Sequence, residues 1–182
     1  MAFMDFFKKE EQDQFDPLQD LVLSKLKVGF YLDYDLKTWE VTRKYKYDYG
    51  DGYVSVEWEL TSGREKVYLE FSDDEEVTWT VARKIPIGAV GANVRKEIME
   101  NDDPPEQLTY KDKTYYLDES APGKMYEDGE DTAREFIKWE FIDEDEENFI
   151  TIEQWGESEF EASTGTYVEE YQFENILPGI TE

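Results

Sequence analysis

The chain lacks two residue types on which much of protein chemistry depends: it contains no cysteine and no histidine. Without cysteine it cannot form disulfides, thiol nucleophiles, iron–sulfur clusters or thiolate zinc sites. Without histidine it loses the usual general base, the commonest metal ligand and the Ser–His catalytic pair. We therefore predict no cofactor and assign no catalytic residue. The sequence does not indicate whether the protein works in a reducing or an oxidising compartment, because a chain without cysteine is compatible with both.

Positive charge is also scarce, with 19 Lys and Arg against 46 Asp and Glu and a formal net charge of -27. Nucleic acid and anionic membrane surfaces require basic patches, so neither is an expected partner. The charge favours a protein partner with a basic surface, a polyamine or a divalent cation. A solvated acidic surface with no specific partner explains the same composition.

Long apolar runs are missing as well. No stretch is long enough to span a bilayer, and no secretory signal is evident, so we expect a cytoplasmic protein. The Phe-rich segment Met1–Lys9 has two interpretations, a small amphipathic anchor or a loose tail.

Aromatic residues are plentiful, and 13 Tyr, 11 Phe and 5 Trp can build a core despite the charge. The segment Val54–Leu60 alternates apolar and polar residues around Trp58, which is typical of a half-buried strand. Its acids Glu57 and Glu59 share one face, which we expect to be solvated. A similar Trp-Glu-apolar pattern returns at Ile137–Phe141.

Short alternating segments joined by turns predict antiparallel meanders in both halves of the chain. Landmarks repeat in order: Lys113–Leu117 echoes Lys37–Val41, and Trp139–Phe141 echoes Trp58–Leu60. We therefore predict a mainly β fold of two duplicated antiparallel β-meander or small-barrel units packed together, with one or two short helices.

The predicted boundaries are 1–25 for the N-terminal tail and a short helix, 26–87 for the first β repeat, 88–105 for a linker with a short helix, and 106–178 for the second β repeat. Helices are expected after Asp16-Pro17 and over Asn93–Glu100. Extra turns are expected in the second repeat at Ser120–Thr132, Asp143–Asn148 and around Ser163–Gly165.

Acidic residues gather in the predicted turns, where their oxygens could bind a hard cation such as calcium. The candidate metal ligands are Asp48, Asp51, Asp73, Asp74, Glu75 and Glu76. None of these runs has the spacing of a known calcium loop. Charged hairpin tips that merely protect exposed edges explain them equally well.

Two further sets of residues are candidates for function. Trp155 has the opposite parity to Ile150 and Ile152, so it would form a contact surface with Tyr167 or Tyr171 if it were exposed. Carboxylates could also pair for glycosidase-like acid–base chemistry. The residues considered for that role are Glu57, Glu59, Glu140, Glu153 and Glu157.

Several segments together resemble a known family. They are Lys27–Phe30, Lys37–Val41, Trp58–Leu60, Leu108–Leu117, Ile152–Gly156 and Glu161–Gly165. In this order, over about residues 26–178, they resemble the bacterial domain of unknown function 4178 family. The resemblance implies no established activity. Related genes tend to lie near those for phage-shock-type membrane proteins and polyamine-synthase-like enzymes, which associates the family with envelope stress or polyamine biology.

The sequence leads to several functional hypotheses. The first is a non-catalytic acidic interaction module in a bacterial membrane-stress or polyamine-linked system. The main alternative is a polycation or divalent-metal binder. A carboxylate-dependent hydrolase and a nucleic-acid mimic are further alternatives.

Overall fold

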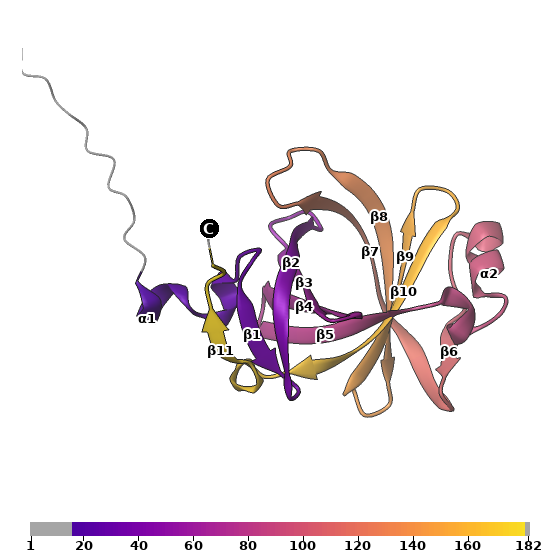
Figure 1. Ribbon diagram of the computed structural model, residues 1–182. Helices are drawn as coiled ribbons and strands as arrows, with labels where there is room; N and C mark the ends of the chain where they lie inside the picture. Colours follow the sequence, from indigo (N-terminus) through magenta and orange to yellow (C-terminus); the bar gives the residue numbers. More distant parts are fainter. Residues whose placement is uncertain (1–15, 181–182) are drawn as a thin grey trace, which may run out of the picture.

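A computed structural model describes residues 16–180 (Figure 1). Within them, eleven antiparallel strands form one sheet, which confirms the mainly β prediction. The strands are β1 (Tyr31–Tyr34), β2 (Lys37–Asp48), β3 (Val54–Ser62), β4 (Glu65–Asp73), β5 (Val77–Ile85), β6 (Gln107–Tyr110), β7 (Lys113–Glu127), β8 (Arg134–Asp143), β9 (Asn148–Trp155), β10 (Glu159–Val168) and β11 (Glu174–Leu177). The helical segments are α1 (Pro17–Asp20), η1 (Leu23–Lys25), η2 (Ile87–Val90), α2 (Val94–Asn101) and η3 (Glu170–Gln172).

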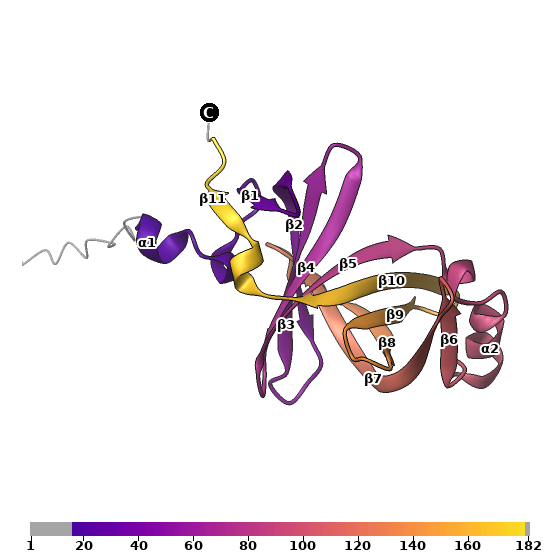
Figure 2. The same ribbon diagram turned by 90° about the horizontal axis from the view of Figure 1, so that it is seen from below.

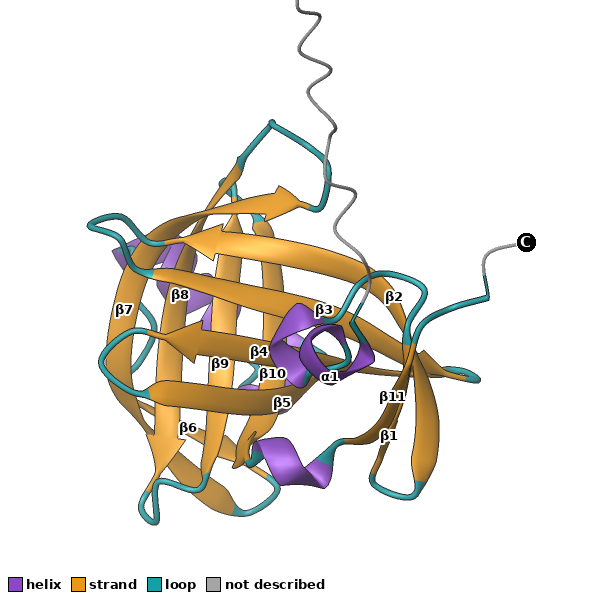
Figure 3. Cartoon of the chain, turned by 90° about the vertical axis from the view of Figure 1, so that its left-hand side faces the viewer, coloured by secondary structure: helices purple, strands orange, loops and turns teal. Residues whose placement is uncertain are grey.

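The sheet closes on itself, because β2 pairs with both β3 and β7. The closed ring follows the order β2-β3-β4-β5-β10-β9-β8-β7, while β1, β11 and β6 extend it outside (Figure 3). The two predicted meanders, β1–β5 and β6–β10, are thus joined edge to edge in one sheet. Both begin with a short strand, a two-residue turn with positive φ (Asp35–Leu36 and Lys111–Asp112) and a long strand. The sequence duplication itself remains a prediction.

The long strand of each meander carries a β-bulge that exchanges its two faces. The register shifts between Val41 and Arg43 in β2, and between Leu117 and Glu119 in β7. Since side chains alternate along a strand, one extra residue moves the odd positions from one face to the other. Trp39 is therefore buried against the outside of the ring, whereas Tyr47 on the same strand lies inside.

Two apolar cores cover the outside of the ring. The first outer core packs Trp39, Trp58 and Trp79 of β2, β3 and β5 against Leu23 and Leu26 of the N-terminal segment. Indole Nε1 of Trp58 donates to the Leu26 carbonyl oxygen at 2.9 Å. The second outer core packs apolar residues of β7, β8 and β9 against η2, α2 and β6. Figures 1 and 2 agree in placing α1 and α2 at opposite ends of the molecule.

The inner face of the ring is polar, which corrects the expected orientation of two acids. Glu57 lines an interior cavity and Glu59 is only 5% exposed, so neither lies on an open solvated face. The alternation of β3 was predicted correctly, but the face opposite Trp58 points into an enclosed space. Its acids therefore have a partly desolvated environment.

Of the predicted extra turns, Asp143–Asn148 does contain the turn between β8 and β9, whereas Gly165 and most of Ser120–Thr132 lie in continuous strand. β7 runs through Ser120 to Glu127, and β10 runs through Gly165. A Cβ atom at Gly165 would collide with the Phe149 ring, and one at Gly123 would lie 2.6 Å from Phe136 Cζ. These glycines therefore admit aromatic rings over the inner wall rather than ending strands.

The short helices lie where they were expected. Asp16 caps α1 by accepting from the Leu18 N–H at 3.0 Å. α2 follows Asn93, whose side chain makes no capping bond. No helix in residues 16–180 has the length and apolar content needed to cross a bilayer. The hypotheses on Met1–Lys9 fall outside the described residues.

Candidate functional site

A cavity of about 550 Å³ lies inside the ring, and all eight ring strands contribute to its lining. This volume falls within the range of small-molecule pockets in proteins. One end is lined by turn residues: Tyr53 follows β2, and Asp74 and Glu75 follow β4. All three are exposed to solvent, so we call this end the mouth of the cavity.

The lining is strongly acidic. Its carboxylates are Glu57, Glu70, Asp74, Glu75, Glu119, Glu140 and Glu153. Its cations are Lys84 and Lys138. The remaining lining includes tyrosine rings and the hydroxyl groups of serines and threonines, so the wall combines negative charge, π-faces and neutral hydrogen-bonding groups.

Acids face acids across neighbouring strands of the inner wall. Glu57 is the register partner of Glu70, and Glu119 is the register partner of Glu140. Like charges directly opposite each other destabilise a sheet. The acidic wall therefore has a folding cost that the packing of the outer cores must offset.

Each lysine of the cavity sits between a carboxylate and an aromatic face. Lys84 forms an ion pair with Glu161 and lies 5.3 Å from the Tyr68 ring centre. Lys138 Nζ lies 3.5 Å from a Glu140 oxygen and 5.1 Å from the Tyr49 ring centre. Carboxylate and aromatic face are the two groups that hold an ammonium ion, so the protein already binds two ammonium groups of its own here.

A third acidic position has no directly paired lysine among residues 16–180, although Lys84 lies close enough to Glu57 to lower its pKa. Tyr47 donates its hydroxyl hydrogen to Glu57 at 3.0 Å, and Glu57 faces Glu70. Among residues 16–180, neither acid forms an ion pair. Ser55, two residues before Glu57, is 3% exposed, and its hydroxyl has no hydrogen-bond partner in that range. Such a buried polar group requires an explanation, and a ligand would supply one.

Burial sets the protonation of these acids. Burial, with the charges of Glu70 and Glu153, raises the pKa of Glu57 well above its usual range. Burial raises the pKa of Glu153 to about 7. Burial alone would lower the pKa of Lys138, but Tyr49 and the surrounding acids raise it. The lysines therefore stay charged near neutral pH, while part of the acidic wall holds protons.

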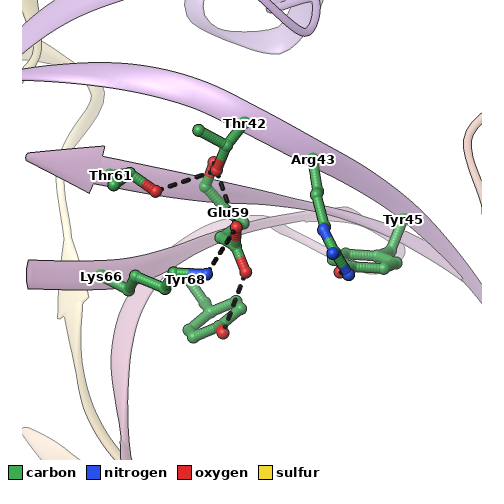
Figure 4. A network of polar contacts seen from close by, with 7 residues as sticks. All are labelled: Thr42, Arg43, Tyr45, Glu59, Thr61, Lys66 and Tyr68. Atoms are coloured by element: carbon green, nitrogen blue, oxygen red, sulfur yellow. Dashed lines mark hydrogen bonds and ion pairs between the residues drawn. The ribbon is translucent and has the colours of Figure 1, made fainter. Parts of the chain in front are cut away.

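Glu59 does not line the cavity and belongs to a network of its own, which meets the lining only at Tyr68 (Figure 4). One of its oxygens accepts from Thr42 Oγ1 at 2.7 Å and Lys66 Nζ at 3.1 Å, and the other from the Tyr68 hydroxyl at 3.2 Å. Burial would raise the pKa of Glu59, but the bonds from Thr42 and Lys66 lower it. Glu59 is thus an ionised acid with full hydrogen bonding, which contrasts with Glu57 two residues earlier.

The predicted metal ligands are spread apart. Only Asp74 and Glu75 line the cavity, at its mouth, whereas Asp48, Asp51, Asp73 and Glu76 do not. Across residues 16–180, no group of three or more acidic side chains is placed to hold a metal ion. Of the predicted ligands, Asp74 and Glu75 therefore contribute carboxylates to the mouth of the cavity.

The predicted contact surface is not formed. Trp155 is 6% exposed, with its ring 4.8 Å from that of Phe136 and the Arg134 guanidinium 4.9 Å from its centre. Trp155 does lie on the face of β9 opposite to Ile150 and Ile152, as predicted, but this face points to the inside of the ring. Tyr167 lines the cavity. Tyr171 is 78% exposed in η3, so the three side chains share no surface.

Fold and site together define a class: a closed antiparallel sheet around an acid-rich interior cavity. The chain belongs to the family described as Domain of unknown function (DUF4178), whose model matches residues 27–170. It is 34% identical over 177 residues to an uncharacterized protein of Aquifex aeolicus (strain VF5), with 94% of each chain covered. No solved structure matches the chain.

Proposed function

We propose that the protein is a non-catalytic binding protein that takes a small organic cation with amino groups into the ring. The observation that carries this proposal is the pair Glu57 and Glu70, which face each other in the cavity and form no ion pair with any lysine or arginine of residues 16–180. An ammonium group between them would stabilise the ionised form of both carboxylates, and a second amine of the same ligand could donate to the Ser55 hydroxyl.

The chemistry of the wall favours an amine over a metal ion. A hard cation such as calcium requires six to eight oxygen ligands in close order. The cavity instead alternates carboxylates with tyrosine rings and hydroxyl groups, which suits ammonium groups carried on methylene chains. We further propose that the protein acts in the cytoplasm and in a polyamine-linked system.

A protein partner is a second candidate. The strands β11 and β6 end the sheet and each has only one neighbouring strand in the described part of the chain, so each presents a free edge. A free edge can accept a strand of a partner. A specific protein recovered from the native host would support the interaction module in a membrane-stress system.

The test of cation binding is thermal unfolding of the full chain with spermidine, calcium, magnesium and sodium chloride at matched ionic strength. A ligand at one hundred times its dissociation constant stabilises the folded state by about 2.7 kcal/mol. For a chain of this size the midpoint then rises by roughly 5 to 10 °C. We expect this saturable rise with spermidine only.

Two variants make the test specific. Glu57→Gln removes a carboxylate of the cavity, and we expect it to abolish the rise. Glu76→Gln removes the same charge from a turn residue outside the lining, and we expect it to leave the rise intact. Equal shifts with every salt would indicate charge screening alone and would contradict the proposal.

A further inference from the structure

The cavity wall has an order from its mouth to its interior that bears on the shape of the ligand. Along β4, Glu70 and Ser72 line the cavity, and Asp74 lines it just beyond the end of the strand. Alternate residues of a strand share a face and advance by about 6.7 Å. Glu70 and Asp74 are two such steps apart, so their Cα atoms are separated by roughly 13 Å along the wall.

Neutral hydroxyl groups fill the interval. Ser72 is the register partner of Ser55 on β3 and of Thr78 on β5, and all three line the cavity. One step deeper, Glu70 is the partner of Glu57. The wall thus runs from an acidic mouth across a band of hydroxyl groups to an inner acidic pair.

The two lysines of the cavity are committed to other acids. Lys84 pairs with Glu161 and Lys138 with Glu140, on β10 and β8. Within residues 16–180, no lysine or arginine forms an ion pair with the acids at either end of the wall. The Ser55 hydroxyl, 3% exposed and without a partner in the same range, lies between these two ends.

We propose that the cavity binds a linear polyamine lengthwise, with one terminal ammonium between Glu57 and Glu70, the other at Asp74 and Glu75, and a central amine at Ser55. This inference rests on the proposed function and specifies its ligand. The length of the wall favours ligands whose terminal amino groups are about as far apart as its two acidic ends. The band of hydroxyl groups favours a ligand with an amine in the middle of its chain over one with methylene groups alone.

The experiment is calorimetric titration of the full chain with unbranched α,ω-diamines from 1,3-diaminopropane to 1,10-diaminodecane at fixed pH and ionic strength. Short diamines reach only one acidic end, so we expect affinity to rise by about tenfold once both ends are reached. Spermidine and 1,8-diaminooctane have the same chain length, but only spermidine has a central amine. We expect spermidine to bind more tightly, and Ser55→Ala to reduce that difference.

Variants at the mouth separate the two ends of the site. Asp74→Asn should remove the preference for long diamines while short ones bind as before. Glu76→Gln, in the same exposed turn but outside the lining, should leave the preference unchanged. Both substitutions are in solvent-exposed positions, so loss of folding does not compete with this interpretation.

The outcomes distinguish the two levels of the proposal. If diamines of every length bind equally and Asp74→Asn changes nothing, lengthwise binding is wrong while amine binding stands. If no amine of any length binds, the proposed function is itself wrong.

Discussion

The two faces of the same strands differ in what they contribute to the molecule. On β3, Trp58 is fully buried on the outer face, while Glu57 on the inner face lies in a cavity with an opposed acid. The outer cores bury apolar surface, which provides the main stabilising free energy. The inner wall keeps charges and a hydroxyl group that has no hydrogen-bond partner among residues 16–180, and both reduce stability. On β3 this cost falls on Ser55 and Glu57, and a wall segment of this kind is better suited to binding than to packing.

The largest effect in this comparison should come from the outer face. Trp58→Ala removes a fully buried indole and its bond to the Leu26 carbonyl, so we expect it to lower the free energy of unfolding by about 3 to 5 kcal/mol. Chemical denaturation measures this change. Tyr53→Ala, at the exposed mouth, is the control and should cost less than about 1 kcal/mol. Similar losses in both variants would remove the distinction between the outer core and the cavity lining.

The acids of the inner face should make the free energy of unfolding depend on pH. The pKa of Glu153 is raised from its usual 4.5 to about 7 in the folded protein. The folded state therefore binds a proton that the unfolded state has lost, and this stabilisation is present below about pH 4.5 and lost as pH rises through 7. Glu153→Gln should abolish this decline, which is at most about 3 kcal/mol. The check is denaturation at several pH values between 2 and 8, a range that also covers the control below.

A buried acid outside the cavity provides a control, because its pKa is shifted in the opposite direction. Asp143 is 2% exposed and accepts from Lys113 Nζ and Asn148 Nδ2, each at 2.7 Å. Burial would raise its pKa, but these bonds lower it well below its usual range. Its stabilisation is therefore present above about pH 4 and lost as pH falls further. If Asp143→Asn and Glu153→Gln changed the pH profile in the same direction, the contrast between a fully bonded acid and a cavity acid would be wrong.

The sequence predicted the alternation of these strands but not what each face meets. Val54–Leu60 has the period of a half-buried strand, and nothing in that period says whether the polar face is open or enclosed. Enclosure depends on the pairing of Tyr45 with Glu127 and of Asp48 with Lys124, which closes the ring between distant parts of the chain. The bulges after Val41 and Leu117 also escaped prediction, because one extra residue has no distinct composition.

The candidate residues show the same limit. The acidic turns were identified, but only Asp74 and Glu75 were brought to the cavity, because the direction of each turn depends on the ring. Ser55 and Glu70 were not singled out, although both have the parity of the polar face on their strands. A sequence signal for the cavity did exist: the repeated polar face of β3, β4 and β5. It could be interpreted only together with the closed topology.

The smallest effect should come from relieving repulsion on the inner wall. Glu119 faces Glu140 across β7 and β8, and Glu119 is exposed to solvent. Glu119→Gln removes one of two opposed charges without changing side-chain size, so we expect it to raise the free energy of unfolding by about 0.2 to 1 kcal/mol. High salt should shrink this gain, because screening already weakens the repulsion in the parent chain. Denaturation of both chains at low and high sodium chloride measures it. A loss of stability instead would mean that Glu119 makes a favourable contact, and the inner wall would then be stabilised by its acids rather than strained by them.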